Sequence, residues 1–217
     1  MTQVQMAIGE IFLEEPPAKE DREDGLFRIL SVGRFVEKKG HLTGLVAFRR
    51  FITRKPNAEY TIIGDGPLRR AMEAYIKREG IGPKVHLTGE LTQKDVRKEM
   101  LRTDVFLFPS ETASNGDMEG QGLVVQEAQA CGLPVIVTRH NGVPAGMLDG
   151  KTGFVVEERD ATAMAERLIC LEMNSSMRTR MAKTSRQFAV QNFSGTTLAE
   201  KLETVLISAF TRNLQVN

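Results

Sequence analysis

Residues that commonly bind metals or form disulfide bonds are scarce in this sequence. Only two of the 217 residues are cysteine and only three are histidine. Cys131 and Cys170 lie in apolar, helix-like surroundings, which favours reduced thiols with a structural role. The histidines, at positions 41, 86 and 140, are not spaced as metal ligands. We therefore expect neither a disulfide framework nor a bound metal.

An excess of one charge and a long apolar run are also missing. The chain has 29 Lys and Arg residues against 28 Asp and Glu residues, a formal net charge of +1. This balance gives no overall field that would attract nucleic acid or a membrane, so any anion site must be local. No apolar run approaches the ~18 residues of a membrane span, and no basic segment followed by an apolar one opens the chain. These features predict a cytoplasmic protein without a nucleic-acid partner.

The pattern that is present alternates short apolar strands with helical segments. Strands are expected at residues 27–32, 60–63, 85–87, 105–108, 134–138 and 153–156. Helices are expected at 41–55, 67–79, 92–102, 122–131 and 160–173, with two more between 175 and 212. Several strands are apolar on both faces, which is typical of a parallel sheet covered on both sides. The sequence thus predicts an α/β fold, a Rossmann-like doubly wound parallel sheet of about six strands with helices on both faces.

The chain divides by composition into three parts. Residues 1–25 are interpreted as a linker or tail, because the stretch from 14 to 24 is charged and carries two prolines. Residues 26–190 are predicted to form the Rossmann-like domain, and residues 191–217 a carboxyl-terminal helix. In such sheets, ligands bind outside the carboxyl ends of the strands. Polar and glycine residues collect in the loops that follow those ends, which begin near residues 33, 64, 88, 109 and 139.

The most informative loop is the one that leads from residue 109 into the helix near residue 122. Glycines at positions 120 and 122 lie between two carboxylates, Glu119 and Glu127. A glycine turn before a helix exposes free N–H groups that suit an anion, and the carboxylates could hold polar groups on either side of it. Two exposed glutamates, or the acid and base of a glycosidase, are the alternatives. The glycine turn argues against the glycosidase, and the apolar neighbours of Glu127 argue against simple exposure.

Two further loops offer weaker signals. Residues 33–40 follow the first strand and carry Arg34, which can donate a forked pair of hydrogen bonds, and Lys39, a point charge. A solvated loop is the alternative. Gly64 and Gly66 resemble part of a dinucleotide fingerprint, but Arg69 occupies the place of the third glycine. These glycines therefore serve either a strand-to-helix turn or direct ligand contact.

The histidines also allow alternatives. His86 alternates within a predicted strand, which favours a structural role. His140 lies at the carboxyl end of a strand, where either a structural role or a contact to a transferred sugar is compatible with its position. No Asp-x-Asp pair offers a clamp for a metal-bound nucleotide.

Taken in order, these motifs resemble the carboxyl-terminal half of a family 4 (group 1) retaining glycosyltransferase with the GT-B fold. The resemblance covers about residues 27–173. It rests on residues 31–40, 63–67, 85–89, 104–110, 119–127, 128–138 and 149–156. No single segment is specific, but the combination is.

The resemblance implies a site for a nucleoside diphosphate sugar and a reaction that retains anomeric configuration, with no cofactor and no metal. Arg34 and Lys39 match the diphosphate-binding pair, Glu119 the acid that contacts the sugar, and Glu127 the acid that holds the ribose. Arg34, Lys39 and Glu119 are the expected catalytic residues. The other expected donor-binding residues are Gly33, Gly64, Gly66, Gly89, Leu91, Ser110, Gly120, Gly122, Leu123 and Val124; those at 122–124 match the turn whose amides meet the phosphates, and those at 89 and 91 the loop that frames the base.

The sequence also departs from the family. Members of the family carry an amino-terminal domain that binds the acceptor. We expect this domain to be missing here, and with it the part through which a peripheral association with membranes would occur. Residues 6–9 faintly resemble the linker between the two domains. Ala145 stands where the family usually has Glu. This half alone should therefore bind a donor but transfer slowly or not at all.

The expected function is donor binding in a hexosyltransferase that acts on a glycan or lipid-linked acceptor. The alternative is a non-catalytic module that binds a nucleotide sugar or docks to a partner chain. A nicotinamide-dependent oxidoreductase is disfavoured by the incomplete glycine fingerprint. The donor base, the sugar, the acceptor and the oligomeric state stay open.

Overall fold

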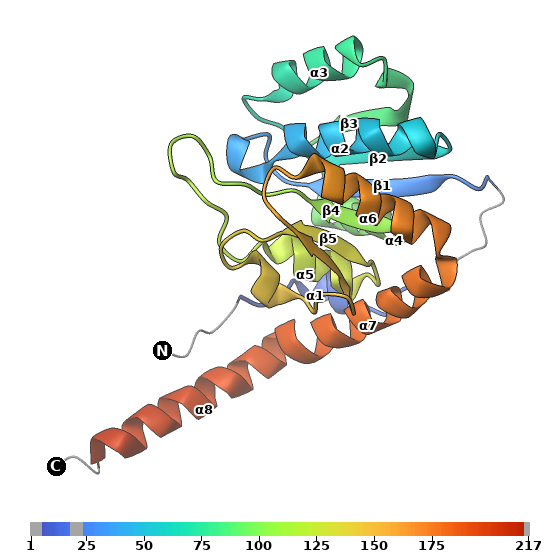
Figure 1. Ribbon diagram of the computed structural model, residues 1–217. Coiled ribbons are helices and arrows are strands. Elements are labelled where there is room, and N and C mark those ends of the chain that lie inside the picture. The colour runs from blue at the N-terminus through green and yellow to red at the C-terminus, as the bar shows by residue number, and fades with distance from the viewer. Residues whose placement is uncertain (1–5, 18–23, 215–217) are drawn as a thin grey trace.

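The computed structural model describes residues 6–17 and 24–214, except for the side chains of 208–214. A six-stranded sheet with the order β3-β2-β1-β4-β5-β6 forms its centre (Figure 1). The strands are β1 Phe27–Val32, β2 Ala58–Ile63, β3 Val85–Gly89, β4 Val105–Phe108, β5 Val135–Thr138 and β6 Gly153–Val156. Every neighbouring pair is parallel. The predicted doubly wound α/β fold is confirmed.

Helices cover both faces of the sheet. The α-helices are α1 Glu10–Leu13, α2 His41–Arg54, α3 Arg69–Arg78, α4 Gln93–Arg102, α5 Leu123–Ala130, α6 Ala161–Met173, α7 Ser175–Phe193 and α8 Gly195–Leu214. Short 3-10 helices are η1 Glu37–Lys39, η2 Gly82–Lys84 and η3 Val143–Gly146. The chain order of the strands reverses direction between β1 and β4, and the crevice at such a reversal is where doubly wound sheets bind ligands.

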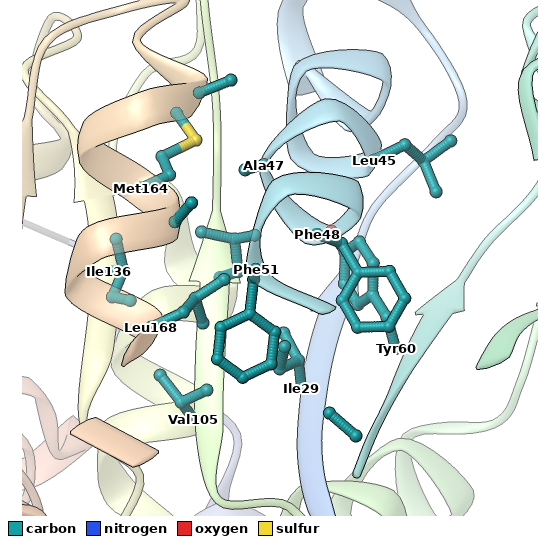
Figure 2. Close-up of a cluster of buried hydrophobic side chains, with 14 of the residues drawn as sticks. Ile29, Leu45, Ala47, Phe48, Phe51, Tyr60, Val105, Ile136, Met164 and Leu168 are labelled. Carbon is teal, nitrogen blue, oxygen red and sulfur yellow. The ribbon is translucent and has the colours of Figure 1, made fainter. Parts of the chain in front are cut away.

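One face of the sheet packs against α2 and α6, which lie side by side (Figure 1). Figure 2 shows Phe48 and Phe51 of α2 with Leu168 of α6, packed beside Ile29 and Val105 of the strands. All five side chains are at most 1% exposed. Because neighbouring side chains of a strand point to opposite faces, Leu30 and Phe106 pack in the other layer.

The second layer holds α1, α4, α5 and α7. Val125 and Ala128 of α5 pack with Ala189 and Phe193 of α7 in this layer. Ile8, just before α1, joins the same cluster. Both faces of β4 and β5 are buried, which explains why β4 is apolar throughout and β5 is apolar up to its last residue, Thr138.

The amino-terminal segment differs from the predicted linker. Ile8 and Phe12 are only 3% and 1% exposed, so residues 8–13 pack on the domain. The charged stretch that guided the prediction begins later, at Glu14, and residues 18–23 lie outside the described part. The apolar residues that precede it are too few to show a helical period, so their burial could not be recognised from the sequence.

Most local helix signals in the sequence agree with the structure. Thr92 caps α4 by accepting a hydrogen bond from the amide of Asp95, and Asp160 caps α6 in the same way. The helix expected from Pro67 begins two residues later, at Arg69. The boundary predicted after residue 190, between the domain and the carboxyl-terminal helix, falls inside α7. The break between α7 and α8 lies at Ser194.

The last helix, α8, leaves the domain and extends away from the sheet (Figure 1). Leu202, Leu206 and Ile207 are 43%, 58% and 59% exposed on it. Within the described residues, no helix has the length and apolar character needed to cross a bilayer.

Candidate functional site

The loops at the carboxyl ends of β1, β2 and β3 are hydrogen-bonded to one another. Gly33 donates its N–H to Ile63 O at 2.9 Å, and Gly64 donates to Gly89 O at the same distance. A Cβ at Gly64 would lie 2.1 Å from the carbonyl oxygen of Gly33. Any larger residue would clash with this carbonyl oxygen, so the turn between strand and helix requires a glycine at position 64. This was one of the two roles considered for it, the other being direct contact with a ligand. A Cβ at Gly66 would likewise meet the Phe35 backbone.

A cation and a carboxylate from distant parts of the sequence meet at this edge. Lys39 Nζ donates to Glu119 Oε2, and the two side chains are only 17% and 16% exposed. The Lys39 ammonium also lies 5.0 Å from the centre of the Phe108 ring, at the end of β4. Two of the three residues expected to be catalytic are therefore in direct contact.

The loop of residues 109–122 is attached to the 3-10 helix η1 that carries Lys39. Glu111 donates its N–H to Lys38 O at 3.0 Å. Lys38 Nζ lies 3.1 Å from Asp117, and Ser114 donates its hydroxyl to Glu37 at 2.7 Å. These contacts hold the cationic loop and the carboxylate loop together.

The amino terminus of α5 follows in the same loop. Gly122 is the N-cap and packs against Phe108. No described residue accepts a hydrogen bond from the amide N–H groups of Leu123 and Val124. Two donors and the positive end of the helix dipole are therefore available to an anion.

The remaining predicted residues divide by exposure. Arg34 and Gly120 are exposed, and Leu91 is 38% exposed. The Arg34 carbonyl accepts the N–H of Val36, but its guanidinium has no hydrogen bond or ion pair with any described residue and is available to a ligand. Ser110 is different: it is fully buried, and its hydroxyl lies 3.0 Å from that of Thr138. In this structure the Ser110 hydroxyl and carbonyl are held against the hydroxyl of Thr138, and donor binding by Ser110 stays a prediction.

The three histidines lie in different surroundings. His86 lies in β3, as predicted, and is exposed; its Nε2 is 3.6 Å from Glu59 of the neighbouring strand β2, a contact compatible with the structural role predicted for it. His140 is fully buried and both of its ring nitrogens are engaged, which excludes a contact between the ring and a sugar in this arrangement.

His41, which no sequence signal marked, is buried beside Phe35, and its Nε2 lies 3.2 Å from Gly33 O. Burial lowers the pKa of His41 to about 4, so it is neutral.

Glu127 lies one turn further along α5, and its carboxylate has no hydrogen-bond partner among the described residues. Burial raises the pKa of this carboxyl to about 7. Within the described part of the chain, neither the Lys39 ammonium nor any other cation forms an ion pair with it. An unpaired, half-buried carboxylate lowers the stability of the fold when it is ionised. Glu127 is therefore a candidate for ligand binding.

We predict that Glu127→Gln makes the protein more stable relative to wild type as pH rises. The unfolded carboxyl ionises near its ordinary pKa of 4.5, whereas the folded one stays protonated to about pH 7. The stability that comes from protonated Glu127 is complete below pH 4.5 and is lost as pH rises to about 7. Urea unfolding between about pH 4.5 and 7.5 should show a gain for the variant on the order of 2 kcal/mol.

Glu166→Gln is the control, because Glu166 is 57% exposed on α6. Its stability difference from wild type should change little with pH. A difference between Glu127→Gln and wild type that stays constant across the range would contradict the burial of this carboxyl.

A cavity of about 970 Å³ lies at the opposite edge of the sheet, among residues such as Phe27, Asp104 and Pro134 at the amino ends of strands. Pro17 and Asp24, the last described residues on either side of the stretch 18–23, are among those that line it. The chemistry-bearing groups are at the carboxyl edge, so we place the candidate site there. Among the described residues, no cluster of three or more His, Cys, Asp or Glu side chains could hold a metal.

Comparison with known proteins decides the family. The model of glycosyl transferases group 1 matches residues 14–188. The chain belongs to the group 1 glycosyltransferase family. It is 32% identical over 179 residues to the colanic acid biosynthesis glycosyltransferase WcaL of Escherichia coli, described as putative in its own name; the match covers 82% of this chain and 44% of that protein.

A GDP-mannose-dependent alpha-(1-6)-phosphatidylinositol monomannoside mannosyltransferase of Mycolicibacterium smegmatis is 30% identical over 179 residues, 82% of this chain and 47% of its own length. This glycosyltransferase-family chain thus spans less than half the length of these relatives.

Solved structures confirm the predicted GT-B half. The C-terminal domain of LpcC, a group 1 family protein from Francisella tularensis, superposes with a TM-score of 0.69 at 21% identity, covering 78% of this chain and 87% of that one. Sucrose-phosphate synthase from Thermosynechococcus elongatus gives a TM-score of 0.79 at 22% identity, covering 96% and 52%. The fold is that of the C-terminal domain of LpcC.

Proposed function

We propose that this chain is the donor-binding domain of a retaining, metal-independent glycosyltransferase, which transfers a sugar from a nucleoside diphosphate sugar to a glycan or lipid-linked acceptor. The observation that carries the proposal is the contact between Lys39 and Glu119 beside the free amides of α5. A cation, two N–H donors and a carboxylate suit a diphosphate joined to a hydroxyl-rich sugar.

The same groups suit the reaction. When the bond between the anomeric carbon and the diphosphate oxygen breaks, negative charge grows on the departing diphosphate. Lys39 and the amides of Leu123 and Val124 are fixed before the reaction, so they stabilise that charge more in the transition state than in the ground state. The exposed Arg34 guanidinium adds a second cation to the departing diphosphate. The bond between the sugar carbon and the acceptor oxygen forms, and the proton of the acceptor hydroxyl passes to the departing diphosphate oxygen.

The remaining assignments follow the family motif. Glu119 holds hydroxyls of the sugar, and Glu127 holds the ribose through a carboxylate that ligand binding ionises. The loop at Gly89 and Leu91 frames the base. WcaL and the amylovoran glycosyltransferase AmsK of Erwinia amylovora act, by their names, in colanic acid and amylovoran biosynthesis, which supports a glycan or lipid-linked acceptor.

A thermal-shift screen of UDP-, GDP- and ADP-sugars tests the proposal. We expect one nucleotide series to raise the melting temperature, since a ligand present at 100 times its Kd stabilises by about 2.7 kcal/mol. EDTA should not change the shift. The absence of a shift with all three series would overturn donor binding.

The alternative, a module that docks to a partner chain without catalysis, has one supporting observation. Leu202, Leu206 and Ile207 on α8 expose apolar surface that a partner could cover. Turnover of the bound sugar nucleotide in the presence of acceptor glycans separates the two, because a docking module binds without transfer.

A further inference from the structure

His140 lies behind the candidate site and is fully buried. Its Nε2 accepts the backbone N–H of Glu119 at 2.9 Å, and its Nδ1 lies 2.5 Å from Glu158 Oε1. A backbone amide can only donate, so Nε2 carries no proton and Nδ1 must donate its own to the carboxylate. The two contacts therefore fix one neutral tautomer of the ring.

Glu158, just after β6, is anchored in turn by the start of the same loop. Its Oε2 accepts the backbone N–H of Thr112 at 2.8 Å, and its Oε1 lies 3.3 Å from the Thr112 hydroxyl. Although partial burial opposes it, these bonds and the one from His140 lower the pKa of Glu158. The carboxylate stays charged and keeps the imidazole oriented.

Asn141 completes the contact with Glu119. Its side-chain amide donates to Glu119 O at 2.7 Å. Two consecutive residues, His140 and Asn141, thus hold the N–H and the C=O of Glu119 and fix where its side chain begins. At the other end of that side chain, Lys39 and the Gly120 N–H bind the two carboxylate oxygens.

We propose that His140, backed by Glu158 and assisted by Asn141, is a positioning residue that orients Glu119 toward the hydroxyls of the donor sugar. The inference rests on the proposed function, because it assigns Glu119 to the sugar. His140 itself does not touch the donor. It acts through the main chain of Glu119, as a group that holds a site residue within a few tenths of an ångström of its productive place.

The experiment compares the affinity for a sugar nucleotide with the affinity for the matching nucleoside diphosphate, both by calorimetry. In His140→Phe, we expect the sugar nucleotide to bind about 10-fold more weakly and the diphosphate to change by less than about 3-fold. In His140→Gln, the amide oxygen can replace Nε2 as acceptor, so the preference for the sugar nucleotide should largely return. A role in packing alone would not distinguish the two ligands.

Two further variants keep the test decisive. Asn141→Gly removes the second contact without disturbing the positive φ of 43° at this position, and it should lower the same preference even if His140→Phe fails to fold. His86→Phe, an exposed histidine outside the site, should leave the preference unchanged. NMR of the ring nitrogens in the wild type should show a protonated Nδ1 and an unprotonated Nε2 for His140.

The outcomes separate the two proposals. If the wild type binds neither ligand of any nucleotide series, the proposed function fails and the inference with it. If the wild type prefers the sugar nucleotide and both His140→Phe and Asn141→Gly keep that preference, only the inference is overturned. The opposite ring tautomer in the wild type would also overturn it.

Discussion

Replacing Lys39 by alanine is expected to weaken binding of a nucleoside diphosphate by roughly 10- to 150-fold, the equivalent of about 1.5–3 kcal/mol for a lost charged hydrogen bond. Lys39 is mostly buried between Glu119 and the Phe108 ring, so its ammonium is held in one place before a ligand arrives. The variant also leaves the Glu119 carboxylate, only 16% exposed, without its cation. An unpaired carboxylate repels a diphosphate, which adds to the loss.

Calorimetry with the nucleotide selected in the thermal-shift screen measures the effect. Lys38→Ala is the matched control: Lys38 precedes Lys39 directly but pairs with Asp117, whose side chain is 54% exposed. An exposed ion pair contributes about 0–1 kcal/mol, so this variant should bind nearly as well as wild type. Arg34→Ala, which removes an exposed and unpaired guanidinium, should also lower the affinity. Unchanged binding by Lys39→Ala would reject the diphosphate assignment.

Gly40→Ala should destabilise the fold by more than about 3 kcal/mol, through strain at a left-handed residue together with a steric clash. Gly40 joins η1 to α2 with a φ of 62°, and a Cβ there would lie 1.8 Å from the carbonyl oxygen of Pro109. Backbone atoms cannot move aside as a flexible side chain can. The loops that carry Lys39 and Glu119 would have to separate, so donor binding should fall with stability.

Gly80→Ala is the matched control, since Gly80 has a φ of 66° and a Cβ added there would meet nothing within 4 Å. It should cost only the left-handed conformation, about 1 kcal/mol. Urea unfolding of both variants measures the difference. Equal losses would mean that the contact between Gly40 and Pro109 is not rigid, and the proposed coupling of the two loops would be wrong.

Most of the fold was readable in the sequence because its layers repeat a simple pattern. Strands buried on both faces, such as β4 and β5, are almost entirely apolar, and six strands separated by helical segments allow few arrangements other than a parallel sheet. The caps at Thr92 and Asp160 were readable for a similar reason, since a cap depends on residues three positions apart.

The parts that were missed depend on contacts between distant residues. Phe12 is buried by α4 and α5, which lie about 80 and 110 positions later, and its own neighbours give no sign of that. Ser110 was placed in the right loop, but its hydroxyl turns toward Thr138.

The sequence by itself determined the sheet, the family and the edge at which the candidate residues gather, because periodicity, turn residues and motif spacing are local properties. The tertiary structure alone decided which of those residues touch: Lys39 with Glu119 across 80 positions, and Glu119 with His140 across 21. It also decided that His140 faces the loop rather than a ligand. Hydrogen bonds and ion pairs act over a few ångströms, and only the folded chain brings such residues within that distance.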